Sequence, residues 1–234
     1  MILRIGRNHM VAEELRRMTF EEIKDNQIIL NWIKSADKSL HELGFTEHNI
    51  AHLTHVMSDA VYLLSELGYD EHTIELTKIA YFLHDIGNAI NRKQHHVIGS
   101  ILVSQLLQNL NVPIDDIVQI SNAICCHDMP SDKPTSPIAA ALIIADKSDV
   151  RRSRVRKENL NDFDIHDRVN YSIFYSCLLI ENNIITLEVN MDPEYSSSFA
   201  FYEIFLDRMK MCKEAAAVLN CTFDLKFNEG GNNK

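Results

Sequence analysis

The chain contains few of the residues that interrupt helices. Its 234 residues include 7 glycines and 5 prolines, too few for the many turns of a β-sandwich. The 5 cysteines form no CxxC pair and two of them are adjacent, which argues against a disulfide framework and a zinc ribbon. No apolar run is long enough to cross a bilayer, and the N-terminal segment MILRIGRNHMVAEELRR lacks the apolar core of a signal peptide. We therefore expect a helical protein of the reducing cytoplasm that has no membrane partner.

Acidic residues outnumber basic ones. The chain has 33 Asp and Glu against 23 Lys and Arg, which gives a formal net charge of -10. This balance argues against a protein whose main task is binding bulk nucleic acid, although it leaves room for a local basic pocket that takes a small phosphorylated substrate. The hydrophobic content of 46% is sufficient for a substantial core.

Hydrophobic spacing predicts a mainly α protein as far as about residue 150. Apolar residues recur at helical spacing in segments that end near Gly44, Gly68 and Gly87, and we expect Gly87 to end its helix in the left-handed conformation. The later segment YSIFYSCLLIENNIITLEVNM reads as two strands joined by an ENN turn, and a helix and a further strand follow it. The expected parts are an N-terminal helical extension (1–39), a helical domain (40–160) and a small α+β appendage of β-β-α-β order (161–234).

Metal-ligand residues stand at the ends of several apolar helices. The run IAYFLHDIG places His84 and Asp85 at the end of a helix apolar enough to be buried. An unpaired buried carboxylate is costly, and no Arg or Lys stands at helical spacing within that turn, so a metal is favoured over a salt bridge. Asp146 repeats the pattern after IAAALIIA, and His127 ends another apolar helix. Such helix ends can build a metal site in the core of a bundle.

A histidine-rich helix precedes these residues. His48, His52 and His55 share one helical face, which indicates a cationic or metal-lined surface without showing which of them coordinates. His95 and His96 begin another predicted helix.

The order His52, His84-Asp85 and Asp146, in the contexts HLTHV, FLHDIGN and IIADKSD, resembles the HD-domain superfamily of metal-dependent phosphohydrolases. The resemblance covers about residues 40 to 156 and implies an HD-domain helical bundle in which these four residues hold one metal. A subset of the family holds a second metal through two more histidines, one in an HxxxG context and one in an AIxxH context. HHVIG supplies the first at His95, with His96 as the alternative register, and AICCH supplies the second at His127.

We therefore expect one or two divalent metals (Mn, Fe, Co, Ni, Mg or Zn) and favour a binuclear site. In that site Asp85 bridges the metals, and His95 and His127 complete the second one. The alternative is a single metal with both of these histidines at the surface.

Two departures from the family pattern narrow the expected substrate specificity. Asn88 stands where many members have Lys, and no GYP signature follows His127, which argues against a cyclic-di-GMP phosphodiesterase.

The resemblance implies hydrolysis of a phosphoester or phosphoanhydride by metal-activated water. The expected substrate is a nucleotide or another small phosphorylated metabolite. Beside Asp85, the candidate catalytic residues are Asp149, as an orienting group or proton acceptor, and Arg151 and Arg152, as clamps for a substrate phosphate. The alternative interpretation of these arginines is a solvated helix end. Arg92 and Lys93 form a second candidate pair.

Two other functions fit the same residues. A di-iron HD-type oxygenase would use the same six ligands, and a non-catalytic nucleotide-binding regulatory module would bind without turnover. The C-terminal appendage could form a homodimer or shape the substrate pocket, and the sequence does not decide between these roles.

Overall fold

The computed structural model describes residues 18–45, 50–129, 133–157 and 159–229, and for residues 50–52, 54, 55 and 229 it describes the backbone alone. The helical part contains α1 (Phe20–Lys24), α2 (Gln27–Glu42), α3 (Ile50–Glu66), α4 (Glu71–Leu83), the 3-10 helix η1 (Ile86–Ala89), α5 (His95–Asn109), α6 (Ile114–Cys126) and α7 (Pro137–Ser148). Two 3-10 helices, η2 (Arg152–Arg154) and η3 (Leu160–Asp162), lead to α8 (Ile165–Ser172). The chain then forms β1 (Ile173–Glu181), β2 (Ile184–Met191), α9 (Ser198–Val218) and β3 (Thr222–Glu229). The mainly α fold with a small β-β-α-β appendage is thus confirmed.

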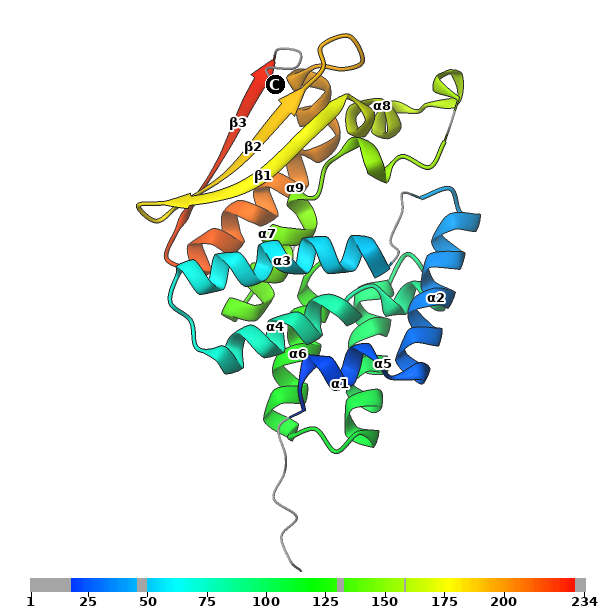
Figure 1. Ribbon diagram of the computed structural model, residues 1–234, viewed down its shortest axis with the longest axis vertical. Helices are drawn as coiled ribbons and strands as arrows, with labels where there is room; N and C mark the ends of the chain where they lie inside the picture. The colour runs from blue at the N-terminus through cyan, green and yellow to red at the C-terminus, as the bar shows by residue number, and fades with distance from the viewer. Residues whose placement is uncertain (1–17, 46–49, 130–132, 158, 230–234) are drawn as a thin grey trace, which may run out of the picture.

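Helix α7 is the centre of the molecule. Every residue of α7 from Ile138 to Ser148 is buried, as expected for a helix that is apolar on all sides. It packs against α3, α4, α6 and α9. Figure 1 shows α9 running behind the sheet towards α7. The central helix therefore joins the helical part to the appendage.

The three strands have the order β1-β2-β3. β1 and β2 are antiparallel and are joined at Asn182 and Asn183, whose positive φ angles of 50° and 61° suit a tight hairpin. β3 returns parallel to β2 after the crossover through α9. One hydrophobic core includes Ile143 of α7, Leu187 of β2 and Phe201 of α9. The division at residue 160 stays a prediction, since the appendage shares this core with the helical part.

The glycines that end helices are only partly as expected. Gly44 and Gly68 adopt positive φ angles of 78° and 75° just after α2 and α3, which confirms their capping role. The expectation for Gly87 is wrong, because it lies inside η1 without a positive φ. Its lack of a side chain serves a close approach instead, since a Cβ at this position would lie 2.0 Å from the carbonyl oxygen of His95.

Among the described helices, none is both long and apolar enough to span a membrane.

Candidate metal centre

Two histidine side chains are oriented by the ends of their own helices. His84 follows the last residue of α4, and its Nδ1 donates to the carbonyl oxygen of Tyr81 at 2.6 Å. His127 follows the last residue of α6 in the same way, and its Nδ1 donates to the carbonyl oxygen of Ile124 at 2.7 Å. A proton on Nδ1 leaves the lone pair on Nε2, which is the arrangement of a metal-binding imidazole.

His95 completes a set of three imidazoles. Its Nδ1 lies 3.0 Å from the carbonyl oxygen of Arg92, again three residues earlier in the chain. The Nε2 atoms of His95 and His127 are only 3.1 Å apart. When each Nδ1 holds the proton, these two nitrogens face each other as acceptors, and a cation between them would satisfy both. A guanidinium nitrogen of Arg92 already lies 3.2 Å from Nε2 of His95.

Asp85 supplies the negative charge for this cation. Its Oδ1 lies 3.3 Å from Nε2 of His95 and 3.9 Å from Nε2 of His127. The ligand atoms of these three residues all lie within 4.8 Å of one another. Asn88 fixes the same carboxylate, because its carboxamide nitrogen donates to Oδ1 of Asp85 at 2.8 Å and to the Asp85 carbonyl at 2.9 Å.

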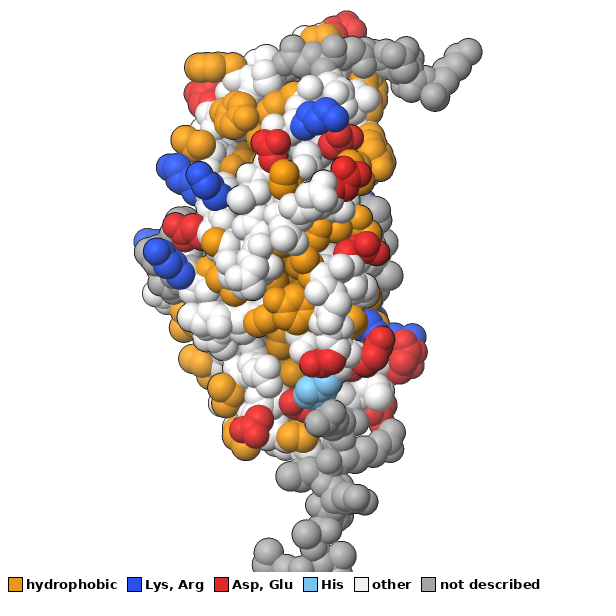
Figure 2. Space-filling view, turned by 90° about the vertical axis from the view of Figure 1, so that its left-hand side faces the viewer, with side chains coloured by type: hydrophobic (Ala, Val, Ile, Leu, Met, Phe, Trp, Pro, Cys, Tyr) orange, Lys and Arg blue, Asp and Glu red, His pale blue; other side chains and the backbone are white. Residues whose placement is uncertain are grey.

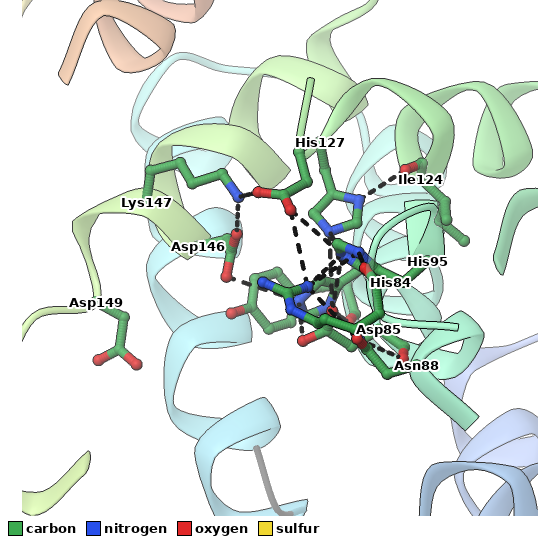
Figure 3. Close-up of polar contacts among 12 residues, drawn as sticks. His84, Asp85, Asn88, His95, Ile124, His127, Asp146, Lys147 and Asp149 are labelled. Carbon is green, nitrogen blue, oxygen red and sulfur yellow. Dashed lines mark hydrogen bonds and ion pairs between the residues drawn. The ribbon is translucent and has the colours of Figure 1, made fainter. Parts of the chain in front are cut away.

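A second group of ligand atoms lies beside the first. It consists of His84, His127 and Asp146, again within 4.8 Å of one another. Nε2 of His84 is buried without a hydrogen bond, 3.2 Å from Oδ2 of Asp85 and 3.7 Å from Oδ1 of Asp146. Asp85 thus turns one oxygen to each group, and Figure 3 shows these side chains converging. Imidazole nitrogens and carboxylate oxygens in such sets fit divalent Mn, Fe, Co, Ni or Zn.

The electrostatics of the cluster favour a cation as well. Burial disfavours a charged imidazole, but the carboxylates of Asp85 and Asp146 outweigh it and raise the pKa of His84 to about 10. Burial, together with the charges of His84 and Lys147, lowers the pKa of His127 to about 3. Although burial acts in the other direction, Lys147 and His84 hold the pKa of Asp146 well below its usual value. His127 is therefore neutral and Asp146 is ionised. His84 carries a proton that a bound metal would displace.

The sequence interpretation missed a buried ion pair at this site. Lys147 is 5% exposed, and its Nζ lies 2.5 Å from Oδ1 of Asp128 and 2.8 Å from Oδ2 of Asp146. Asp128 also brings Oδ2 to 3.6 Å from Nε2 of His95. The sequence signal that could have pointed to this ion pair is adjacency, because Asp128 and Lys147 each directly follow a predicted ligand.

The structure describes the side chains of some predicted ligands and not those of others. His84, Asp85, His95, His127 and Asp146 come together, from α4, α5, α6 and α7 and the turns that follow them. His96 is buried beside them without belonging to either ligand group among the described residues. The backbone of His52 lies in α3, but its side chain and all of His48 lie outside the described part of the chain. The metal-binding role of each residue stays a prediction.

The predicted catalytic residues beyond Asp85 lie elsewhere. Asp149 is buried, and its carboxylate lies 2.9 Å from Nε of Arg151 and 3.1 Å from a guanidinium nitrogen of Arg154. In Figure 3 Asp149 stands apart from the ligand cluster. Arg152 donates to the carbonyl oxygen of Tyr171 at 2.5 Å and stacks on the Tyr171 ring at 4.3 Å. The catalytic roles of Asp149, Arg151 and Arg152 stay predictions that this geometry does not favour.

A cavity of about 300 Å³ opens onto the ligand cluster. The helical part lines it with ligand side chains and with the cations Arg92, Lys147 and Arg154, whereas Lys93 is exposed and does not line it. Leu43, Gly44 and Phe45 line it at the end of α2, and the appendage supplies a further wall, which comprises Asp164, His166, Asp167, Asn170, Phe205 and Arg208. The C-terminal residues therefore shape the pocket.

Comparison with known proteins agrees with this geometry. Residues 49–151 match the family model of the HD domain. The chain is similar to Uncharacterized protein MJ1020 of Methanocaldococcus jannaschii (24% identity over 109 residues, 40% of this chain and 42% of the relative). It is also similar to Ribonuclease Y of Mycoplasma mycoides (30% identity over 156 residues, 65% of this chain and 34% of the relative). The chain thus spans less than half the length of either relative.

Among solved structures, the chain is similar to a protein described as a predicted HD superfamily hydrolase from an uncultured Thermotogales bacterium. The TM-score is 0.44 at 27% sequence identity, and the match covers 57% of this chain and 75% of the other. The family match spans all five of the described ligand candidates. The family match therefore identifies residues 49–151 as an HD domain.

Proposed function

We propose that the protein is a metal-dependent hydrolase that cleaves a phosphoester or phosphoanhydride of a small substrate, such as a nucleotide or another phosphorylated metabolite. The observation that carries the proposal is the position of Asp85, which turns Oδ2 towards His84 and Oδ1 towards His95. A carboxylate shared in this way suits two cations at once. We assign His52, His84, Asp85 and Asp146 to one metal.

The second metal of the proposal is held by Asp85, His95 and His127. Bound divalent metals would supply a hydroxide nucleophile near neutral pH and polarise the phosphoryl oxygens. The protein side chains orient and neutralise the substrate. The guanidinium groups of Arg92 and Arg154 line the cavity and can each bind phosphate oxygens in bidentate fashion.

Lys147 adds a fixed positive charge beside the ligands. Burial disfavours its charged form, but Asp146 and Asp128 outweigh this and raise its pKa, so that it stays protonated. The carboxylate of Asp128 lines the cavity with a pKa held below its usual value by Lys147, in spite of burial. Asp128 is therefore ionised near neutral pH and can accept a hydrogen bond from a hydroxyl group or water.

The size of the cavity supports a small substrate. A volume of about 300 Å³ is at the lower end of the range for small-molecule sites. Acidic and basic side chains are interspersed on the face drawn in Figure 2, without a continuous basic area among the residues described there. A second candidate substrate is RNA, because the relative named Ribonuclease Y of Mycoplasma mycoides is 30% identical to this chain over 156 residues. A cytoplasmic location and a homodimer stay predictions.

Metal analysis followed by a substrate screen tests the proposal. The purified protein is analysed for metal content and then assayed for phosphate release from nucleotides and sugar phosphates, and for strand cleavage of a short RNA, with Mn, Fe, Co, Ni or Mg. We expect Asp85→Ala to lose metal and turnover together, whereas Asp115→Ala, at an exposed position in the first turn of α6, should retain both. Full metal content and full activity in Asp85→Ala would contradict the proposal.

The number of metals has its own test. His127→Ala should bind one metal fewer per chain than the unmodified protein, since His127 belongs to the group with Asp85 and His95. An unchanged stoichiometry would refute the binuclear version and leave the mononuclear one. Turnover that consumes oxygen and releases no phosphate would instead identify an oxygenase.

A further inference from the structure

The appendage contributes a cation to the cavity. α9 packs against α7, the helix that carries Asp146 and Lys147. This packing brings Arg208 and Phe205 of α9 to the cavity wall, more than fifty positions after the last predicted ligand in the sequence. The guanidinium of Arg208 stacks on the Phe205 ring, 4.7 Å from its centroid.

Arg208 differs from the other cations that line the cavity. Lys147 is paired with Asp128 and Asp146, and Arg154 with Asp149. No ion pair or hydrogen bond joins Arg208 to another described residue, although the side chain is half-buried. A guanidinium cannot shed its charge in proteins, so partial burial without a carboxylate is unfavourable unless an anion binds.

The electrostatic surroundings of Arg208 support an anion site. Burial and the charge of Arg154 lower its pKa, and together they outweigh the carboxylates of Asp146 and Asp128, which act in the other direction. The carboxylates of the same wall lie on the other appendage helix, where Lys157 is 2.6 Å from Asp167 and 3.7 Å from Asp164. Lys157 offsets part of the charge of these carboxylates, and Arg208 is the cation on this wall that can attract an anion.

We propose that Arg208 binds a second anionic group of the substrate, a phosphate or carboxylate distinct from the phosphoryl group that is cleaved. This inference rests on the proposed function, because the cleaved group is placed at the metal ligands. It narrows the substrate to a compact phosphorylated compound with two anionic groups. The ring of Phe205 supports the guanidinium plane, and the cavity of about 300 Å³ limits the distance between the two anions.

Matched substrates that differ by one anionic group test this role. The substrates are phenyl phosphate, 4-carboxyphenyl phosphate and 1,4-phenylene bisphosphate, and the last two distinguish a carboxylate from a phosphate as the second anion. We expect at least one of these two to be preferred over phenyl phosphate by about 10- to 100-fold in kcat/KM, mainly through KM, as one charge-assisted contact allows. Arg208→Gln should abolish the preference and leave phenyl phosphate within about twofold.

Two further variants sharpen the result. Arg208→Lys should keep part of the preference, because it retains the charge without the planar fork. Arg168→Gln removes an exposed arginine of α8 that does not line the cavity, and should change none of the three rates. The inference is overturned if the unmodified protein shows no preference for a second anion, or if Arg208→Gln slows all three substrates equally.

A binding measurement separates this inference from the proposed function. Phenylphosphonate and 4-phosphonobenzoate resist hydrolysis, and calorimetry gives their affinities for the unmodified protein and for Arg208→Gln. We expect 4-phosphonobenzoate to bind about tenfold or more tightly than phenylphosphonate only when Arg208 is present. If no phosphate ester is hydrolysed but this difference is found, the hydrolase proposal fails and the anion site stands. Equal affinities of the two phosphonates for the unmodified protein would remove the anion site, whether or not any ester is hydrolysed.

Discussion

Replacing Gly87 by alanine is expected to disrupt the metal centre without removing any of its ligands. The new Cβ would lie 2.0 Å from the carbonyl oxygen of His95 and 2.6 Å from the backbone nitrogen of Gly99. Real Cβ contacts essentially never fall below 3.0 Å, so η1 and the start of α5 have to separate by roughly 1 Å. Both neighbours are backbone atoms, which means that no side-chain rotation can relieve the clash.

Both the unfolding free energy and the turnover of the Gly87→Ala variant are expected to fall. Overpacking of this kind costs about 1–3 kcal/mol of unfolding free energy. For a chain of this length each kcal/mol lowers Tm by about 2–4 °C, so a decrease between about 2 and 12 °C is expected. A displacement of His95 by about 1 Å can reduce turnover by about 100-fold. Metal affinity and activity should therefore fall by more than the change in stability alone explains.

Gly99→Ala is a matched control on the other side of the same contact. Its Cβ would lie 3.4 Å from the nitrogen of Gly87 and 3.5 Å from a methyl group of Ile124, which is close to ordinary van der Waals contact. Alanine in a helix interior is also preferred over glycine by up to about 1 kcal/mol. We expect unchanged or higher Tm for this variant, measured by circular dichroism with a chelator present, and a normal metal content. Gly87→Ala with the Tm and metal content of the unmodified protein would refute the reasoning.

Three further predictions concern the cluster itself. Lys147→Met removes the cation shared by the buried carboxylate of Asp146 and the half-buried carboxylate of Asp128. It should cost about 3 kcal/mol in urea unfolding of the metal-free protein, and a change below about 0.5 kcal/mol would count against this pairing. Asn88→Ala removes the donor to Asp85 and should weaken metal binding by about 10- to 100-fold in chelator competition, so equal affinities would exclude the orienting role. His127 has a pKa of about 3 in the fold but about 6.5 when unfolded, so below pH 6.5 only the unfolded state gains this proton. The unfolding free energy of the metal-free protein should then fall by up to about 1.4 kcal/mol per pH unit between pH 6.5 and 4.5, and less steeply in His127→Gln, and an identical slope would contradict the prediction.

Local patterns in the sequence predicted most of the fold. Helix ends at Gly44 and Gly68 and the hairpin at Asn182 and Asn183 follow from positive φ angles that these residues adopt at low cost. His84, Asp85, His127 and Asp146 could be named in advance for a similar reason, since each stands at the end of an apolar helix that must be buried. His95 was named only by the family resemblance, through its HxxxG context.

Contacts between distant segments could not be predicted in this way. Arg152 and Arg154 are equivalent in the sequence, and only the tertiary fold sends Arg152 to the carbonyl of Tyr171 and Arg154 to the cavity. Arg208 lies on a helix whose packing partner is set by the whole core. Gly87 resembles a helix terminator in the sequence, whereas its requirement comes from the crossing of η1 and α5. In each case the decisive neighbour is far enough along the chain that periodicity carries no information about it.

The ring orientations of His84, His95 and His127 have a consequence for how the site can change. Each Nδ1 bonds to a carbonyl three residues earlier, and a carbonyl is present whatever side chain that position carries. Substitutions at Tyr81 or Ile124 can therefore alter the packing and leave the ring orientation intact. Each imidazole is thus aligned by a backbone atom of its own local segment. The residues around the centre can therefore change during evolution while the rings keep their orientation, because that orientation depends on backbone atoms that no point mutation deletes.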